Sequence, residues 1–236
     1  MRVVIQRGSG EAGKRVRLDD GEIQHLKVRR AKDGDEVEVM DGAGLVGRGI
    51  VVQLGRDWEV EVRHARVEEP PQEATLAVAA GDRDRFSWMV EKAVELGVTR
   101  IVPLETNRTA GVATRLKPTH LERLRRSALE TIKQCGTAWA PAVEELTPLD
   151  AFAERAGEGS RWLADQKGKP VPSSLDRDPM TVVIGPEGGL TESERDTLIS
   201  AGFQPVSLGP YTLRFETAAV AAAAAITQAR MRGVHG

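Results

Sequence analysis

The sequence predicts an α/β protein in which a small β-barrel precedes a larger domain built around a mainly parallel sheet. Two observations lead to this fold class. The first 66 or so residues read as several short strands around one helix, which is typical of a small barrel. After a proline-containing linker, strands and helices alternate to the end of the chain. This alternation favours a parallel sheet that is covered by helices on both faces.

The N-terminal region contains segments in which apolar and β-branched residues alternate or follow one another, as they do in strands. The sequence Asp-Gly-Ala-Gly at 41–44 is a tight-turn signal between two of these segments. We predict strands at residues 16–18, 36–40, 45–54 and 58–62, and one helix at residues 22–31.

A stiff linker at residues 67–74 separates the two regions. It contains Glu68, Glu69, Pro70 and Pro71. Proline fixes its own φ and disfavours helix in the residue before it, so we expect an extended, solvated segment. We therefore predict two domains, one over residues 1–70 and the other over residues 71–236.

The second region has helices with recognisable ends. Gly97 directly follows the last turn of one predicted helix, a position that glycine favours. Pro118 begins another helix, in the first turn, where its missing N–H costs nothing. Thr191 and Glu194 have the spacing of a capping box. We predict strands at residues 75–80, 101–104, 161–164, 181–184 and 206–208, and helices at residues 86–96, 118–135 and 216–232, with a further helix between Thr191 and Gly202.

The helix at 118–135 carries an apolar stripe that ends in Cys135, so we expect this cysteine to be a core residue and not a nucleophile. Its basic residues are interpreted mainly as a solvated face, although they could also hold an RNA backbone. The stripe consists of Leu121, Leu124, Ala128, Ile132 and Cys135, and the basic residues are Arg115, Lys117, Arg123, Arg125, Arg126 and Lys133.

The composition excludes several classes of protein. The 236 residues contain no apolar run near the roughly 20 residues that span a bilayer, and the N-terminus lacks a signal-peptide segment. We therefore expect a cytoplasmic protein with no membrane partner. One cysteine allows no intrachain disulfide, and His25, His64, His120 and His235 have no paired spacing, so no metal site is expected. The net charge of -2 argues mildly against a nucleic-acid binder, while local basic patches could still bind phosphate.

Two glycine-rich turns follow apolar strands, at residues 184–189 and at residues 208–210. In open α/β sheets, ligands bind outside the carboxyl ends of the strands, and glycine lets the backbone approach them closely. Side by side, these loops would form a pocket of main-chain groups that suits an adenine edge and ribose hydroxyls. Neither loop is a phosphate-binding motif. The alternative for each loop alone is an ordinary strand-to-helix turn.

A family resemblance becomes specific at these loops. The sequences GPEGG at 185–189 and LGP..LR.ETA at 208–218 resemble the C-terminal signature of the RsmE family, the 16S ribosomal RNA uridine-N3 methyltransferases of the SPOUT superfamily. Weaker likenesses lie upstream, at GDR....W...KA.ELGV..I.PL (81–104), KQCG (133–136) and KVRRAKDGD (27–35). The resemblance spans nearly the whole chain, in the same order.

The resemblance implies a PUA-like β-barrel followed by a SPOUT domain whose C-terminal chain forms a trefoil knot. It implies S-adenosylmethionine (SAM) as the methyl donor with no metal, a two-fold homodimer, and 16S rRNA within the 30S subunit as the substrate. The residues implied to bind SAM are Ile184, Gly185, Pro186, Glu187, Gly188, Gly189, Leu208, Gly209, Leu213 and Thr217.

Arg214 is the strongest candidate for a catalytic residue, since its guanidinium could stabilise negative charge on the uracil during transfer. The alternative for Arg214 is an ion pair with Glu216 or Glu187. Glu216 is a candidate general base; it could also be only an acid in the first turn of the last helix, and water could take the proton instead. Arg30 and Arg108 are the candidates for RNA contacts.

The sequence departs from the family pattern at five positions, which bear on RNA contacts more than on the cofactor site. They are Gln24, Arg29, Thr137, Tyr211 and Phe215. Two alternatives to the uridine-N3 activity stay open. One is a SPOUT methyltransferase that acts on a ribose 2′-hydroxyl or on tRNA, and the other is a ribosome-assembly factor without activity.

Overall fold

The computed structural model describes residues 1–109, 116–175 and 178–233. Arg115 and His235 lie outside this range. The chain divides into two compact units, each of which is described by itself. The first consists of Met1–Pro71 and Leu129–Ala140, and the second of Gln72–Ala128 and Pro141–Gly236.

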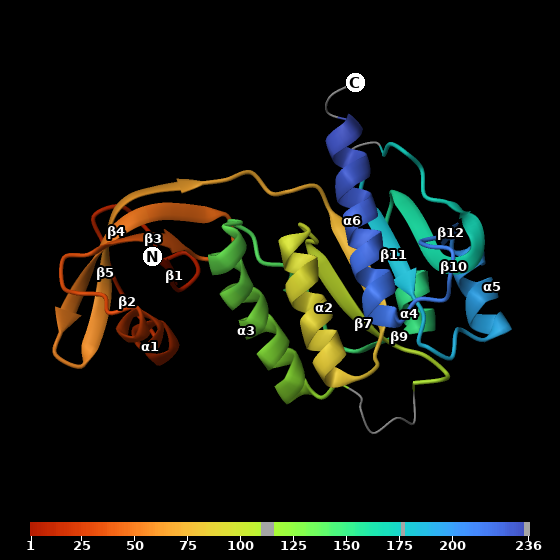
Figure 1. Cartoon of the computed structure of the whole chain (residues 1–236), viewed down its shortest axis with the longest axis horizontal. Helices are drawn as coiled ribbons and strands as arrows, with labels where there is room; N and C mark the ends of the chain where they lie inside the picture. The colour runs from red at the N-terminus through yellow and green to blue at the C-terminus, as the bar shows by residue number, and fades with distance from the viewer. Residues whose placement is uncertain (110–115, 176–177, 234–236) are drawn as a thin grey trace. The chain divides into compact units, whose positions relative to one another are not determined.

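The first unit is built on a five-stranded sheet with one helix, α1 (Asp20–Val28) (Figure 1). β1 pairs with β3 in parallel, and the other neighbours are antiparallel. The order β1-β3-β4-β5-β2 joins β1 (Arg2–Val4), β2 (Arg15–Arg17), β3 (Glu36–Met40), β4 (Leu45–Leu54) and β5 (Asp57–Val67). The core of this unit contains the inward residues of the alternating strands, among them Val39, Val51 and Val60, together with Leu26 of α1.

The predicted strands at 36–40 and 45–54 are confirmed with the same bounds. β1, a strand of three residues, was not predicted. The predicted strand at 58–62 extends to Val67 in the structure, because β5 follows β4 along its whole length past a register shift at Arg48 and Gly49.

A segment distant in sequence completes the first unit. Residues 129–140 include the last turns of α3 (Pro118–Cys135) and pack on the predicted turn at 41–44. A Cβ atom on Gly42 would come within 2.6 Å of Leu129, and one on Gly44 within 2.5 Å of Trp139. Both glycines also have positive φ, so this turn requires glycine for two reasons.

Lys133, one of the basic residues that we interpreted as a solvated face, is buried in the first unit. Its side chain is 5% exposed and its Nζ lies 2.6 Å from a carboxylate oxygen of Glu22, which is itself 3% exposed. Glu130 accepts a second contact from Nζ at 2.7 Å. The solvated interpretation was therefore wrong for Lys133, because α1 covers this part of the helix. Cys135, predicted to be in the core, is exposed at the end of the helix.

The second unit contains a parallel sheet of seven strands. Its order is β12-β10-β11-β6-β7-β8, and β9 also pairs with β7. All pairings are parallel, as the alternation of strands and helices predicted. The strands are β6 (Ala74–Ala79), β7 (Arg100–Glu105), β8 (Ala142–Val143), β9 (Thr147–Pro148), β10 (Ser160–Pro170), β11 (Met180–Ile184) and β12 (Gln204–Ser207).

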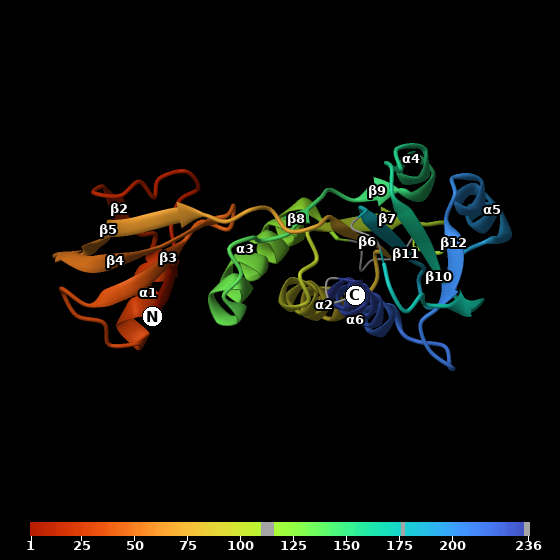
Figure 2. The same ribbon diagram turned by 90° about the horizontal axis from the view of Figure 1, so that it is seen from above.

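Helices cover both faces of this sheet. Figure 2 shows α2 (Arg83–Glu95) and α6 (Phe215–Gly233) on one face, and α4 (Leu149–Glu154) and α5 (Glu192–Ser200) on the other. The alanines of α6 allow close approach to α2 and the strands, since Ala219 and Ala222 are fully buried. No helix among the described residues combines the length and apolar character that a membrane span requires.

The helix ends predicted at Gly97, Pro118 and Thr191 are confirmed, whereas the helix predicted at 22–31 spans Asp20–Val28. Gly97 has φ +73° after α2, and α3 begins at Pro118. Thr191 caps α5 in a complete capping box, in which its hydroxyl accepts from the Glu194 N–H and the Glu194 carboxylate accepts from the Thr191 N–H. These caps fix where each loop leaves its helix, which positions the loops of the site described next.

Candidate functional site

A cavity of about 310 Å³ lies in the second unit at the carboxyl ends of three adjacent strands, β10, β11 and β12. This is the edge at which open α/β sheets bind ligands, and the volume is within the usual range for small-molecule sites. The lining residues are Leu163, Ala164, Asp165, Gln166, Ile184, Gly185, Pro186, Glu187, Gly189, Leu190, Arg195, Leu208, Gly209, Tyr211, Thr212, Leu213, Phe215 and Ala218.

Both predicted glycine loops converge on this cavity. The residues that were predicted for the cofactor and that line it are Ile184, Gly185, Pro186, Glu187, Gly189, Leu208, Gly209 and Leu213. Gly188 and Thr217 are not among the lining residues. A Cβ on Gly188 would lie 3.2 Å from the Arg108 side chain, and Thr217 is exposed on α6.

The cavity has a third wall that the sequence did not reveal, formed by residues 163–166 of β10, where the pairing of β10 with β11 ends. Asp165 forms an ion pair with Arg195 of α5, and the Thr212 hydroxyl donates to the Gln166 side chain at 3.2 Å. No motif marks Asp165 or Gln166. They reach the cavity because β10 lies between β12 and β11, so its carboxyl end is flanked by both glycine loops.

The first glycine loop is a tight turn that is tied to a neighbouring loop. The Gly189 N–H donates to the Pro186 carbonyl at 2.7 Å, and Gly189 has φ +75°. Glu194, buried at the start of α5, accepts from the Asn107 N–H at 2.7 Å as well as from Thr191. Glu194 thereby ties residues 106–109, which follow β7, to the start of α5, and the Arg108 side chain in this segment lies beside Gly188 of the first glycine loop.

Arg214 and Glu216 differ sharply in their surroundings. Arg214 is exposed, and its side chain has no hydrogen bond or ion pair with any residue that the structure describes. Glu216 is 8% exposed and faces Arg85, with Nε of Arg85 3.9 Å from a carboxylate oxygen. Glu187 also contacts Arg85, at 3.4 Å. In the structure, Glu216 and Glu187 therefore pair with Arg85 and not with Arg214.

Phe215, where threonine is common in the family, has a packing role. Its ring is buried, and its centroid lies 6.2 Å from that of Phe86. Gly81 makes room for it, because a Cβ there would come within 2.8 Å of the ring. Tyr211, another departure, is 78% exposed at the cavity. The departure at Phe215 therefore belongs to the core, whereas the one at Tyr211 lies in the exposed lining of the cavity.

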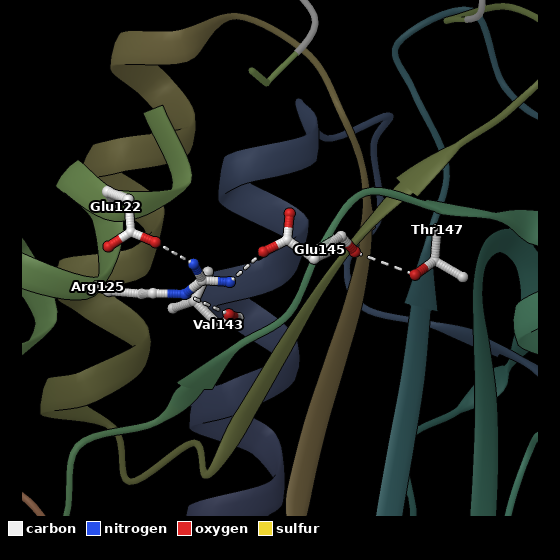
Figure 3. Close-up of polar contacts among 5 residues, drawn as sticks. All are labelled: Glu122, Arg125, Val143, Glu145 and Thr147. Atoms are coloured by element: carbon white, nitrogen blue, oxygen red, sulfur yellow. Dashed lines mark hydrogen bonds and ion pairs between the residues drawn. The ribbon is translucent and has the colours of Figure 1, made fainter. Parts of the chain in front are cut away.

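Arg125, one of the basic residues of α3, is committed to contacts within the protein. Figure 3 shows its guanidinium between Glu122, at 2.5 Å, and Glu145, at 2.7 Å, while Nε donates to the Val143 carbonyl at 2.9 Å. Glu145 in turn accepts from Thr147 through its own carbonyl, at 3.0 Å. The hydrogen bond to Glu145 is the main reason that the pKa of Arg125 is raised. Arg125 thus joins α3 to the segment after β8.

Five other basic candidates have exposed side chains. Lys117, Arg123 and Arg126 are exposed, and so are Arg30 and Arg108. Arg30 adopts φ +57°, a left-handed conformation that is uncommon for a residue other than glycine. Among the described residues, no group of three or more His, Cys, Asp or Glu side chains could hold a metal ion.

The chemistry of the cavity suits a nucleoside-like ligand. Ile184, Leu208 and Leu213 offer apolar surface for a flat ring, and the glycine loops offer main-chain donors and acceptors. Asp165 and Gln166 add polar side chains on the β10 wall. These residues fit the adenosyl group of SAM, and nothing in the cavity resembles a phosphate-binding loop.

Comparisons with known proteins agree with this assignment. Residues 68–227 match the family described as RNA methyltransferase domain, and residues 18–57 match the RNA methyltransferase PUA domain. The chain is 33% identical to Ribosomal RNA small subunit methyltransferase E of Synechocystis sp., over 89% of this chain and 72% of that protein. It is 31% identical to the protein of the same name from Aquifex aeolicus, over 86% and 90%.

A solved structure is similar over nearly the full length. It is a Ribosomal RNA small subunit methyltransferase E from Neisseria gonorrhoeae bound to S-adenosyl methionine, with 27% identity, a TM-score of 0.81 and 95% coverage of both chains.

Proposed function

Because the chain belongs to the family of the ribosomal RNA small subunit methyltransferases E, we propose that it transfers the methyl group of SAM to N3 of a uridine in 16S rRNA. It is a SAM-dependent RNA methyltransferase of the SPOUT class. The observation that carries the proposal is the cavity at the ends of β10, β11 and β12, where both glycine loops of the family signature meet.

The mechanism requires loss of the imide proton of uracil N3 before or during transfer. When bound, SAM supplies a methyl group that is already activated by its sulfonium, so the chain needs only to orient the reactants and move a proton. Arg214, exposed beside the cavity loop, is placed to stabilise the negative charge that develops on a uracil carbonyl oxygen. Glu216 is the candidate proton acceptor, with water as the alternative.

Several finer properties belong to the same proposal. The family likeness supports a PUA-like barrel in the first unit and a trefoil knot formed by the chain that carries the two glycine loops. It also supports 16S rRNA within the 30S subunit as the substrate and the cytoplasm as the location. The SAM site comprises the predicted lining residues of the cavity, with Gly188 and Thr217 beside it.

The direct test is to incubate 30S subunits with the protein and isotopically labelled SAM, and to map the label in 16S rRNA by mass spectrometry. We expect one N3-methyluridine. A label on a ribose 2′-hydroxyl would replace the proposed acceptor atom, and SAM binding without any transfer would favour the inactive assembly factor.

Gly209→Val should weaken SAM binding about tenfold or more. A Cβ on Gly209 meets only Leu213, at 3.7 Å, so the fold accommodates the side chain while its bulk enters the cavity. Gly157→Val is the matched control, since Gly157 lies outside the cavity and faces open space. Calorimetric titration with SAM measures the effect. Equal affinities in the two folded variants would place SAM elsewhere.

Arg30→Ala and Arg108→Ala should each weaken RNA binding and lower the slope of log affinity against log salt by about one. Each phosphate contact releases condensed counterions, and both arginines are exposed, with no side-chain hydrogen bond or ion pair to the described part of the chain. Methyl transfer at saturating RNA should change little. A filter-binding series at several salt concentrations tests this, and an unchanged slope in a variant would make that arginine an ordinary surface residue.

The protein should be a two-fold homodimer, with α6 and the proposed knot at the interface. Ala219 and Ala222 pack inside the chain, but Val220, Ala221 and Ala224 form a second, half-buried row of small side chains on α6. Cyclic dimers are also the commonest oligomers. Light scattering over a concentration series is the measurement, and a persistent 25.6 kDa species at micromolar concentration contradicts the prediction.

A further inference from the structure

Three charged side chains form a cluster beside the cavity. Arg85 comes from the first turn of α2, Glu187 from the first glycine loop, and Glu216 from the first turn of α6. Nη1 of Arg85 lies 3.4 Å from Glu187 Oε1, and its Nε lies 3.9 Å from Glu216 Oε1. One guanidinium therefore connects the first glycine loop to the segment that follows the second.

The approach of Arg85 to Glu216 is fixed by its surroundings. The neighbour of each residue, Phe86 and Phe215 respectively, is fully buried, and the two rings pack together. The Arg85 N–H donates to the Asp82 carboxylate at 3.0 Å, which anchors the first turn of α2. The core and the helix cap thus fix the backbone positions from which the two side chains approach each other.

The Glu216 carboxylate is incompletely satisfied. One oxygen faces Arg85, whereas Oε2 is buried and has no hydrogen-bond partner among the described residues. A buried acceptor without a donor costs free energy, so its retention needs an explanation. The orphan oxygen is suited to accept a proton or hydrogen bond from a ligand. Arg85 places one positive charge next to both Glu216 and Glu187.

We propose that Arg85 is a positioning residue for methyl transfer, which holds Glu216 as the acceptor of the uracil N3 proton. This inference rests on the proposed function. In the step, the proton passes from N3 to Oε2 of Glu216. The electron pair left on N3 forms the bond to the methyl carbon, and the pair of the breaking carbon–sulfur bond stays on sulfur. Arg85 touches neither reactant and acts through the carboxylate.

Arg85→Met should lower the single-turnover rate on 30S subunits about 10- to 100-fold at saturating SAM and RNA. This is less than the roughly 10²–10⁴-fold that general-base catalysis provides, because Glu216 itself is retained. SAM affinity by calorimetry and the melting temperature should change little, because Arg85 does not line the cavity and is partly exposed. Arg85→Lys should recover part of the rate, since it restores the positive charge but not the planar set of hydrogen-bond donors of the guanidinium. Arg83→Met, which removes an exposed arginine without a described partner from the same turn, is the matched control.

A double-mutant cycle with Glu216→Gln identifies the route of the effect. If Arg85 acts through Glu216, Arg85→Met should cause no further loss in the Glu216→Gln background. An undiminished loss there, or a loss equal to that of Arg83→Met, overturns the inference. The proposed function is tested separately, by the product that the wild-type protein forms. If the wild type forms no N3-methyluridine, the proposed function is wrong, and the role of Glu216 as proton acceptor is wrong with it.

Discussion

Arg214→Ala should lower the rate of methyl transfer by about 10²–10³-fold, which is the usual effect of removing one preorganised stabilising group. The side chain follows the second glycine loop and has no hydrogen bond or ion pair with the part of the chain that the structure describes. A residue with no protein partner contributes little to stability, so the melting temperature should remain near that of the wild type. SAM affinity should also stay near normal, because Arg214 does not line the cavity.

Arg214→Lys separates charge from geometry and should restore the rate only in part, because an ammonium lacks the planar fork of the guanidinium. The measurement is single-turnover transfer to 30S subunits beside a thermal melt of each variant. A large loss of melting temperature with normal turnover per folded molecule would assign Arg214 to structure. The stabilisation of the uracil anion would then have to come from another group.

Much of the fold could be predicted because its signals are local. The bounds of α3 agree with the predicted 118–135, since Pro118 marks the start and the apolar stripe marks the length. β3 and β4 show their period over enough residues to be recognised. By contrast, β8, β9 and α4 were missed. They have two, two and six residues, and such short elements are defined by their partners and not by their own pattern.

The assignment of residues 129–140 to the first unit could not be predicted for a different reason. It depends on contacts across about a hundred positions, such as Gly42 against Leu129, and nothing near either residue announces them. The same holds for the β10 wall of the cavity. The glycine loops were recognisable as turns after apolar strands, whereas Asp165 acquires its position only from a strand order that does not follow the sequence.

Charge patterns were the least reliable guide to the site. Arg125 and Lys133 looked like parts of one basic face, yet each has carboxylate partners inside the protein. Arg85 stands at a position that the family likeness at 81–104 leaves unspecified, and its proposed role rests on two carboxylates that belong to distant segments. A sequence states which residues are charged, but their partners decide whether a charge is available to RNA.

Lys133→Met should destabilise the first unit by about 3–5 kcal/mol, because it leaves the Glu22 carboxylate buried without its counter-charge. When the whole chain unfolds in one transition, a change of this size corresponds to a fall in melting temperature of roughly 6–20 °C. Lys117→Met, which removes an exposed lysine just before the same helix, is the control and should have almost no effect. Thermal melts followed by circular dichroism measure both variants.

The double variant Glu22→Leu with Lys133→Met removes both charges and should recover most of the loss, since an apolar pair of similar volume often replaces a buried ion pair without cost.

The pH dependence of this stabilisation has a definite sign. Burial acts to lower the pKa of Lys133, but hydrogen bonds to Glu130 and Glu22 outweigh it, and the net pKa is raised. Because the pKa of Lys133 is higher in the folded than in the unfolded protein, the charged lysine stabilises the fold in full at pH values below its unfolded pKa. This stabilisation is lost only as the pH rises through the folded pKa. The advantage of the wild type over Lys133→Met should therefore persist at neutral pH and shrink under strongly alkaline conditions. Melts of the two proteins that coincide at neutral pH would show that the buried pair contributes nothing to stability.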